Sequence, residues 1–169
     1  MGNELLATKI IWGFFITCGI VIVAALILIG LSFLIMAIKR LKNSECDCPE
    51  YKVYLKKGYV LRYCYGFCVA ADTLLIVIEI AATGLGTFIV LIPDTPSYLV
   101  AIMLITTFIT STLRNALNLP NNRKGYASAF RILEFALDTY RISPRTADDK
   151  QKLIEANIKA QEEIAKFNE

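Results

Sequence analysis

The chain has 169 residues, of which 56% are hydrophobic, against about 45–50% in a typical soluble domain. The excess lies in long uncharged runs, which indicates an integral membrane protein with room for one small aqueous domain. The formal net charge of +3 is too mild to imply nucleic acid as a partner, and the absence of histidine removes the usual general base and the commonest metal ligand.

The first predicted transmembrane helix is the uncharged stretch 10–38. It is longer than the ~20 residues that cross a hydrocarbon core. It is also longer than the apolar region of a signal peptide, which has about 7–15 residues. We therefore predict an uncleaved first span.

A basic, tyrosine-rich segment, residues 39–66, follows the first span. Tyrosine with lysine and arginine beside a membrane is typical of contact with anionic lipid headgroups. The same combination also binds nucleic acid in other proteins, but the position next to a span favours lipid. The residues predicted to contact headgroups are Lys39, Arg40, Lys42, Lys56, Lys57 and Arg62.

Four of the five cysteines stand in two pairs, which raises the alternative of a four-thiolate zinc site. Cys46 and Cys48 are spaced one residue too closely for the usual motif, and Cys64 and Cys68 are four residues apart on a predicted helix. We interpret all five as free thiols and predict no metal site and no cofactor.

The second and third spans form a predicted helical hairpin. The apolar runs are 67–92 and 98–113, and "PDTPS" at 93–97 ends the first of them, since two prolines in four residues break a helix. Leu117 and Leu119 extend the third run. Gly84 and Gly86 are interpreted as points where helices approach closely.

Two carboxylates interrupt the second apolar run. Asp72 and Glu79 are seven residues apart, so on a helix they lie within about 20° of one face, which Thr83 shares. Asp72 stands near the predicted cytoplasmic end, where we expect it to reach the interface. Glu79 is at mid-span, where a charge facing lipid costs several kcal/mol, so it must face protein or water or stay protonated.

Three uses of the two acids are open at this stage. They pair with a buried donor such as Arg114 or a threonine of the third span, they line an aqueous pore, or they carry protons or ions. The third span ends in hydroxyl-bearing residues that either bond to carbonyls of their own helix or line a polar path. These residues are Thr106, Thr107, Thr110 and Ser111.

The C-terminal tail is predicted to form two amphipathic helices on either side of "ISPR" at 142–145. Asn122 is the expected N-cap of the first, and Thr146 and Asp149 form the capping box of the second. Each helix has one apolar seam, which either packs on the other seam in a hairpin or meets other subunits. The seam residues predicted to mediate assembly are Tyr126, Phe130, Leu133, Leu137, Leu153, Ile164 and Phe167.

Basic residues set the predicted orientation. Seven Lys and Arg lie between the first two spans, none lies in the 93–97 turn, and ten lie from Arg114 onward. Positive charge stays on the cytoplasmic side, so the N-terminus is outside and the tail is cytoplasmic. The predicted parts are 1–66 (first span and basic segment), 67–119 (transmembrane hairpin) and 120–169 (cytoplasmic helical tail).

The order of these elements resembles the SLATT family over about residues 50–168. The stretches that carry the resemblance are "YKVYLKKGYVLRYCYGF", the hairpin broken by "PDTP", the linker "NLPNNRKGY", the helix "ASAFRILEFALDTYR" and a final charged helix. The SLATT family comprises two-span effector domains of bacterial nucleotide-signalling and conflict systems. The resemblance implies a non-enzymatic membrane protein that oligomerises through its cytosolic helices and opens a pore.

The sequence therefore predicts an all-α integral membrane protein with three transmembrane helices and a cytoplasmic pair of amphipathic helices. It contains no catalytic constellation, so we predict no enzyme activity. Its expected partners are the lipid bilayer and either further copies of itself or the subunits of a larger complex. The alternatives are a structural membrane-anchored subunit, as in a viral internal membrane or a respiratory complex, and a small ion or proton channel.

Overall fold

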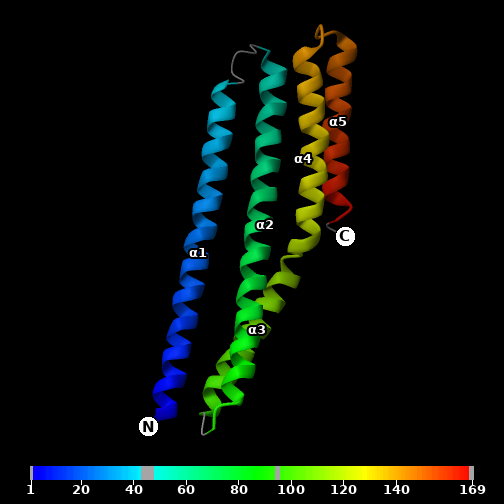
Figure 1. Cartoon of the computed structure of the whole chain (residues 1–169). Helices are drawn as coiled ribbons and strands as arrows, with labels where there is room; N and C mark the ends of the chain where they lie inside the picture. Colours follow the sequence, from blue (N-terminus) through cyan, green and yellow to red (C-terminus); the bar gives the residue numbers. More distant parts are fainter. Residues whose placement is uncertain (1, 43–47, 94–95, 168–169) are drawn as a thin grey trace. The chain divides into compact units, whose positions relative to one another are not determined.

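The computed structural model describes residues 2–42, 48–93 and 96–167, and within those ranges it is helical between short turns, with no strand. The described helices follow one another along the chain (Figure 1). They are α1 (Gly2–Lys42), α2 (Pro49–Val90), α3 (Ser97–Ala116), α4 (Leu119–Ile142) and α5 (Ala147–Ala165). The predicted all-α class is confirmed.

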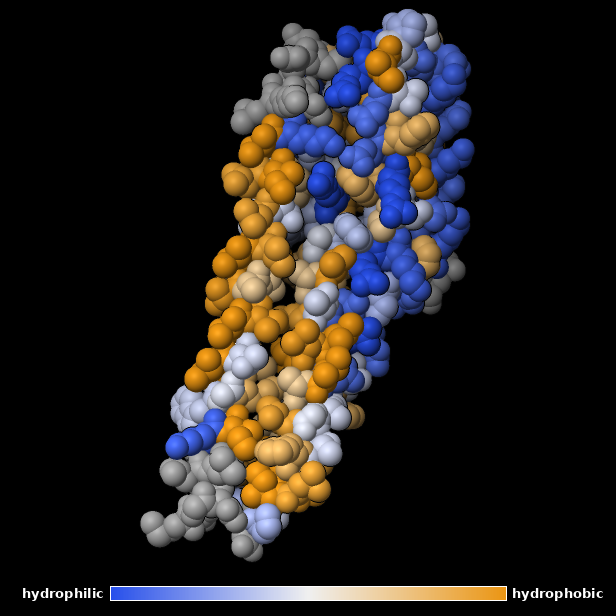
Figure 2. All heavy atoms as spheres, in the orientation of Figure 1, coloured by the Kyte–Doolittle hydropathy of each residue, from blue (hydrophilic) through white to orange (hydrophobic). Residues whose placement is uncertain are grey.

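Within the described ranges, three apolar helical stretches are long enough to cross a membrane. The first is Trp12–Met36 in α1, the second lies in α2, and the third begins with α3 at Ser97. The 20 residues of α3 rise about 30 Å, which is the thickness of a hydrocarbon core. Hydrophobic side chains gather over α1, whereas hydrophilic ones gather over α4 and α5 (Figure 2). Length and composition thus support the membrane assignment.

Two helices begin earlier in the chain than the spans and seams alone suggest. α2 runs without a break from Pro49 to Val90, so the tyrosine-rich segment and the second span share one helix. The first tail helix begins at Leu119, so Asn122 lies inside it and donates its backbone N–H to the Asn118 carbonyl at 3.0 Å. Pro120 fits the first turn of α4, where its missing N–H is not needed. The helical path between α3 and α4 is interrupted at Asn118, whose φ of 46° is in the left-handed region.

The chain divides into two compact units. The first contains α1 up to Leu28 together with Ala70–Leu117. Its core is formed by Phe14, Ala82, Ile89, Leu99 and Met103. A Cβ on Gly86 would lie 3.3 Å from the Met103 Cβ, so the small residue lets α2 and α3 approach closely. Gly84 has no such neighbour within 4 Å, which overturns its predicted role in helix contact.

The second unit contains Ile29–Val69 and the chain from Asn118. It packs α4 and α5 against the first half of α2. The buried core residues are Tyr51, Ala129, Leu133, Leu137, Tyr140, Leu153 and Ala160. Tyr51 is 1% exposed and stacks on Tyr140 with ring centroids 6.1 Å apart, so it belongs to a protein core rather than to a belt at the membrane surface.

Polar contacts fix the register of this second unit. Lys150 Nζ lies 2.8 Å from a Glu50 carboxylate oxygen, and Lys57 Nζ donates to Asn157 Oδ1 at 3.3 Å. These two contacts align α2 and α5 in parallel. At the start of α5, Thr146 forms the predicted capping box with the third residue of the helix, as expected from the sequence.

Several sequence predictions fall on residues that the structure does not describe. Cys46 of the zinc alternative and residues 94–95 of the turn lie outside the described residues. The side chains of Arg40 and Lys42 also lie outside them, although both residues belong to α1.

Candidate intramembrane polar site

An ion pair between α2 and α3 lies at one end of the candidate site. Arg114, in the last turn of α3, places its Nε 2.6 Å from Asp72 Oδ1. The Asp72 side chain is 3% exposed and that of Arg114 is 30% exposed. A charge-assisted hydrogen bond of this length satisfies a carboxylate that burial would otherwise destabilise. Of the three uses left open by the sequence, pairing with a donor of the third span is therefore the one that the structure shows for Asp72.

Glu79 stands two helical turns farther along α2, about 10 Å from Asp72 along the axis. Its side chain is partly exposed. Among the residues that the structure describes, none donates a hydrogen bond or forms an ion pair with its carboxylate. Its backbone carbonyl accepts a hydrogen bond from the Thr83 hydroxyl at 2.8 Å, which is an ordinary helical back-bond. The two acids of one helical face thus differ, since Asp72 is paired and Glu79 has no partner for its carboxylate among the described residues.

The predicted hydroxyl row mostly bonds to its own helix. Thr106 donates to the Ile102 carbonyl at 2.8 Å, and the buried Thr110 donates to the Thr106 carbonyl at 2.9 Å. One pair meets across the helices, because the hydroxyl oxygens of Thr83 and Thr107 lie 3.5 Å apart, which is long for a hydrogen bond. Ser111 is partly exposed on α3.

Together these residues form a polar row along the contact between α2 and α3. The Asp72–Arg114 pair stands at one end and the Thr83–Thr107 contact at the other. Glu79 lies between them in the α2 sequence, without a charged partner in the described part of the chain. A site of this kind holds one acid available to an ion, to a proton or to another chain.

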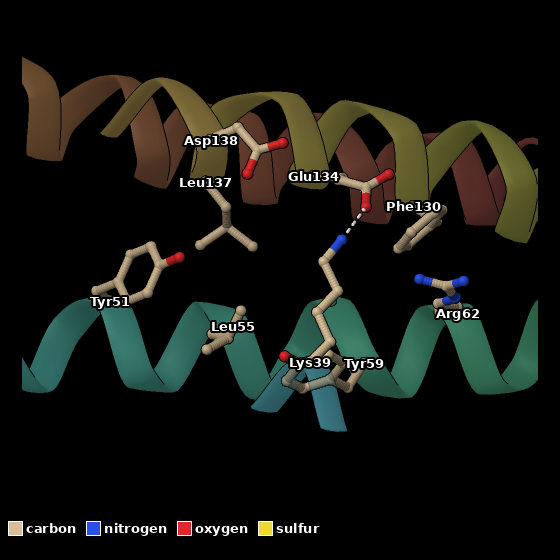
Figure 3. Close-up of a pocket in the computed structure, with 10 residues that line it drawn as sticks. Lys39, Tyr51, Leu55, Tyr59, Arg62, Phe130, Glu134, Leu137 and Asp138 are labelled. Atoms are coloured by element: carbon tan, nitrogen blue, oxygen red, sulfur yellow. Dashed lines mark hydrogen bonds and ion pairs between the residues drawn. The ribbon is translucent and has the colours of Figure 1, made fainter. Parts of the chain in front are cut away.

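Three of the predicted headgroup residues contact other side chains of the protein, and Lys57 does so through its hydrogen bond to Asn157. Lys39 Nζ lies 2.9 Å from Glu134 Oε1, and the Arg62 guanidinium carbon lies 5.6 Å from the centroid of the Phe130 ring. Both basic side chains line a small pocket of about 30 Å³, large enough for about one water molecule (Figure 3). Lys56, by contrast, is exposed on α2.

The predicted assembly seams are also used within the chain. Leu133 is 0% exposed, and Leu137 and Leu153 are 5% and 2% exposed. Phe167 lies against Gly125, where an added Cβ would be 3.2 Å from its ring. Of the two open alternatives, the structure therefore realises the hairpin for these residues. Tyr126, Phe130 and Ile164 are partly buried in the same unit.

Sequence reasoning missed the contacts between distant segments. Lys39 and Glu134 are 95 residues apart, and no periodicity relates them. The burial of Tyr51, by contrast, was predictable, because Tyr51, Leu55 and Gly58 follow one another at spacings of four and three, as residues on one buried face of a helix do.

The charged groups outside the membrane-spanning segments show ordinary helix electrostatics. The backbone N–H of Thr146 donates to the Asp149 carboxylate and holds the pKa of that group below its usual 3.8. The hydrogen bond to Glu50 raises the pKa of Lys150. Neither shift points to an acid or base prepared for catalysis.

Neither a family model, nor a curated protein, nor a solved structure matches this chain. The resemblance to the SLATT family therefore stays a prediction.

Proposed function

We propose that this chain is a non-enzymatic, multi-pass membrane protein whose copies assemble so that Glu79 faces a shared polar path through the membrane. The observation that carries the proposal is the partly exposed carboxylate of Glu79, which no described residue neutralises. The proposed arrangement is SLATT-like and pore-forming, with the N-terminus outside and the C-terminal helices in the cytoplasm.

The energetics favour a protein or water environment for Glu79. A charged side chain at the centre of a lipid-exposed helix costs about 2.5–3.5 kcal/mol on insertion scales. Arg114 is already engaged with Asp72 at 2.6 Å, so Glu79 does not share this neutralising partner. Assembly of several copies around the polar row removes Glu79 from lipid and offers it water or hydroxyl groups.

The neighbouring hydroxyls support a polar path. Thr83 and Thr107 come from two helices and meet beside the acid, with their oxygens 3.5 Å apart. Their bonds to carbonyls of their own helices leave the hydroxyl oxygens able to accept a further hydrogen bond, as water or a hydrated ion provides.

The experiment that tests the proposal is ion flux through liposomes that contain the purified full-length chain. Glu79→Gln removes the charge and keeps the shape, so we expect a clear loss of flux. Asp138→Asn, which removes an exposed carboxylate from α4, is the matched control and should leave the flux unchanged. Equal flux for wild type and Glu79→Gln would show that Glu79 does not line a conducting path.

The native mass of the protein in mild detergent tests self-assembly separately. The proposal predicts an oligomer that contains this chain alone. A monomer that co-purifies with other proteins would contradict self-assembly and favour the structural membrane subunit instead.

A further inference from the structure

A groove runs between α4 and α5 on the outside of the second unit. It has a volume of about 390 Å³ and an apolar lining from Ile132, Phe135, Ala136 and Ala156. Phe135 is 77% exposed, although it sits on a helix with many charged residues. An aromatic ring buries a large apolar area when it is covered, so this position favours contact with another surface.

A second apolar surface lies where α2 meets α5. Val53 and Val60 of α2 are 56% and 53% exposed, and Ile154 and Ile158 of α5 are 40% and 48% exposed. The Lys150–Glu50 and Lys57–Asn157 contacts hold the two helices in parallel, so these residues come at matching heights. We call these four residues the α2–α5 patch.

The groove and the α2–α5 patch lie on opposite flanks of α5. Leu153 and Ala160 face the core, each 2% exposed. Each residue of a helix turns about 100°, so Ile154 and Ile158 lie roughly 100° or more around the α5 axis from Leu153, both in the same direction. Ala156, which lines the groove, lies in the other direction. One face is therefore available to each of two neighbours.

Phe135 and Ile154 stand at the same height in the unit. Phe135 is seven residues before the end of α4 at Ile142, and Ile154 is seven residues after the start of α5 at Ala147. Copies in one membrane share a common height, because rotation about the membrane normal relates them. The groove of one copy thus meets the patch of the next without a vertical shift.

The charges at the two edges are complementary. The groove has Glu155 and Lys159 at its edge, and Lys56 and Glu162 flank the α2–α5 patch. Lys57 contacts Asn157, so the two residues stand at the same height. Lys56 therefore stands within about one helical turn of the height of Glu155. Glu162 is within about 4.5 Å of the height of Lys159. A basic group of one copy therefore stands at the height of an acid of the next.

We propose that the α4–α5 groove of one copy receives the α2–α5 patch of the next copy in the same membrane. Because the two surfaces differ, the contact is head-to-tail and propagates to a ring or an open array. The inference rests on the self-assembly in the proposed function, but not on ion conduction. It also replaces the predicted seams, which are buried within the chain, as the assembly surface.

Native mass spectrometry of the full chain in mild detergent tests this contact. Phe135→Ser disables the groove, and the pair Ile154→Ser and Ile158→Ser disables the patch. We expect each variant to lower the association constant about tenfold or more, as loss of a central apolar anchor does. Ile142→Ser is the matched control, because Ile142 is 84% exposed but lines neither surface.

Mixing the two disabled variants distinguishes a head-to-tail contact from other arrangements. Each variant keeps one intact surface, so the mixture should form 1:1 pairs although neither variant assembles alone. Such pairs also demonstrate that both variants fold. A mixture that stays monomeric would overturn the proposal. So would normal assembly of the patch variant, since the groove would then pair with itself.

The outcome for wild type separates this proposal from the proposed function. A wild-type oligomer that both variants reproduce would refute this contact and leave self-assembly standing. A wild-type monomer would refute both.

Discussion

Removing the arginine of the Asp72–Arg114 pair should destabilise the folded protein more than removing the acid. In Arg114→Met the carboxylate of Asp72 stays in place, 3% exposed and without its guanidinium partner. Breaking a buried pair in this way costs about 3–5 kcal/mol, and we expect the lower end because the arginine is 30% exposed.

The reverse change, Asp72→Asn, leaves a long cation that can turn its head group toward water. The asparagine also keeps a carbonyl oxygen as an acceptor for Arg114. The expected cost is therefore about 1.5 kcal/mol, at the low end for a hydrogen bond to a charged group. The double variant should be more stable than Arg114→Met alone by about 1 kcal/mol, because it has no buried carboxylate that has lost its guanidinium.

The assay is unfolding in mixed micelles by increasing SDS, followed by helical circular dichroism. Asn115→Ala changes an exposed neighbour on α3 and should lie within about 0.5 kcal/mol of wild type. If Asp72→Asn proves as costly as Arg114→Met, burial of the carboxylate is not what makes the pair important.

Three further predictions concern packing and capping. Leu133→Ala should cost about 2–5 kcal/mol of unfolding free energy, measured by the same titration, because the side chain is 0% exposed. Gly86→Leu should cost about 1–3 kcal/mol by wedging α2 from α3, whereas Gly84→Leu, with open space around it, should change stability little. The pKa of Asp149 is lowered in the folded state, so the hydrogen bonds that its carboxylate accepts stabilise the start of α5 at pH values above the ordinary pKa of 3.8. This stabilisation is lost as the pH falls through the folded-state pKa. An acid titration of helicity should show this loss in wild type but not in Asp149→Asn, which has no carboxyl group to titrate.

The fold was largely predictable because uncharged runs, prolines and capping residues act locally. The runs marked the three apolar helices, and Thr146 marked the start of α5. The start of α4 was misplaced because Pro120 and the asparagines after it are typical of loops. A proline is also common in the first turn of a helix, so Pro120 fits a loop and a helix start equally well. The left-handed conformation of Asn118 is what places the start of α4 at Leu119.

The candidate site was predictable only in part. Helical periodicity placed Asp72 and Glu79 on one face, since both lie on one helix. Which acid Arg114 neutralises depends on the register of α2 against α3, and that register follows from packing such as the approach of Gly86 to Met103. Such a distance cannot be read from spacing along the chain.

The close approach at Gly86 has a mechanical consequence for the first unit. A Cβ at this position would lie 3.3 Å from the Met103 Cβ, so there is little room for α2 to rotate against α3 here. The Asp72–Arg114 pair joins the same two helices at a second point. Glu79 lies between these two points in α2, so they fix the direction in which its carboxylate leaves the helix.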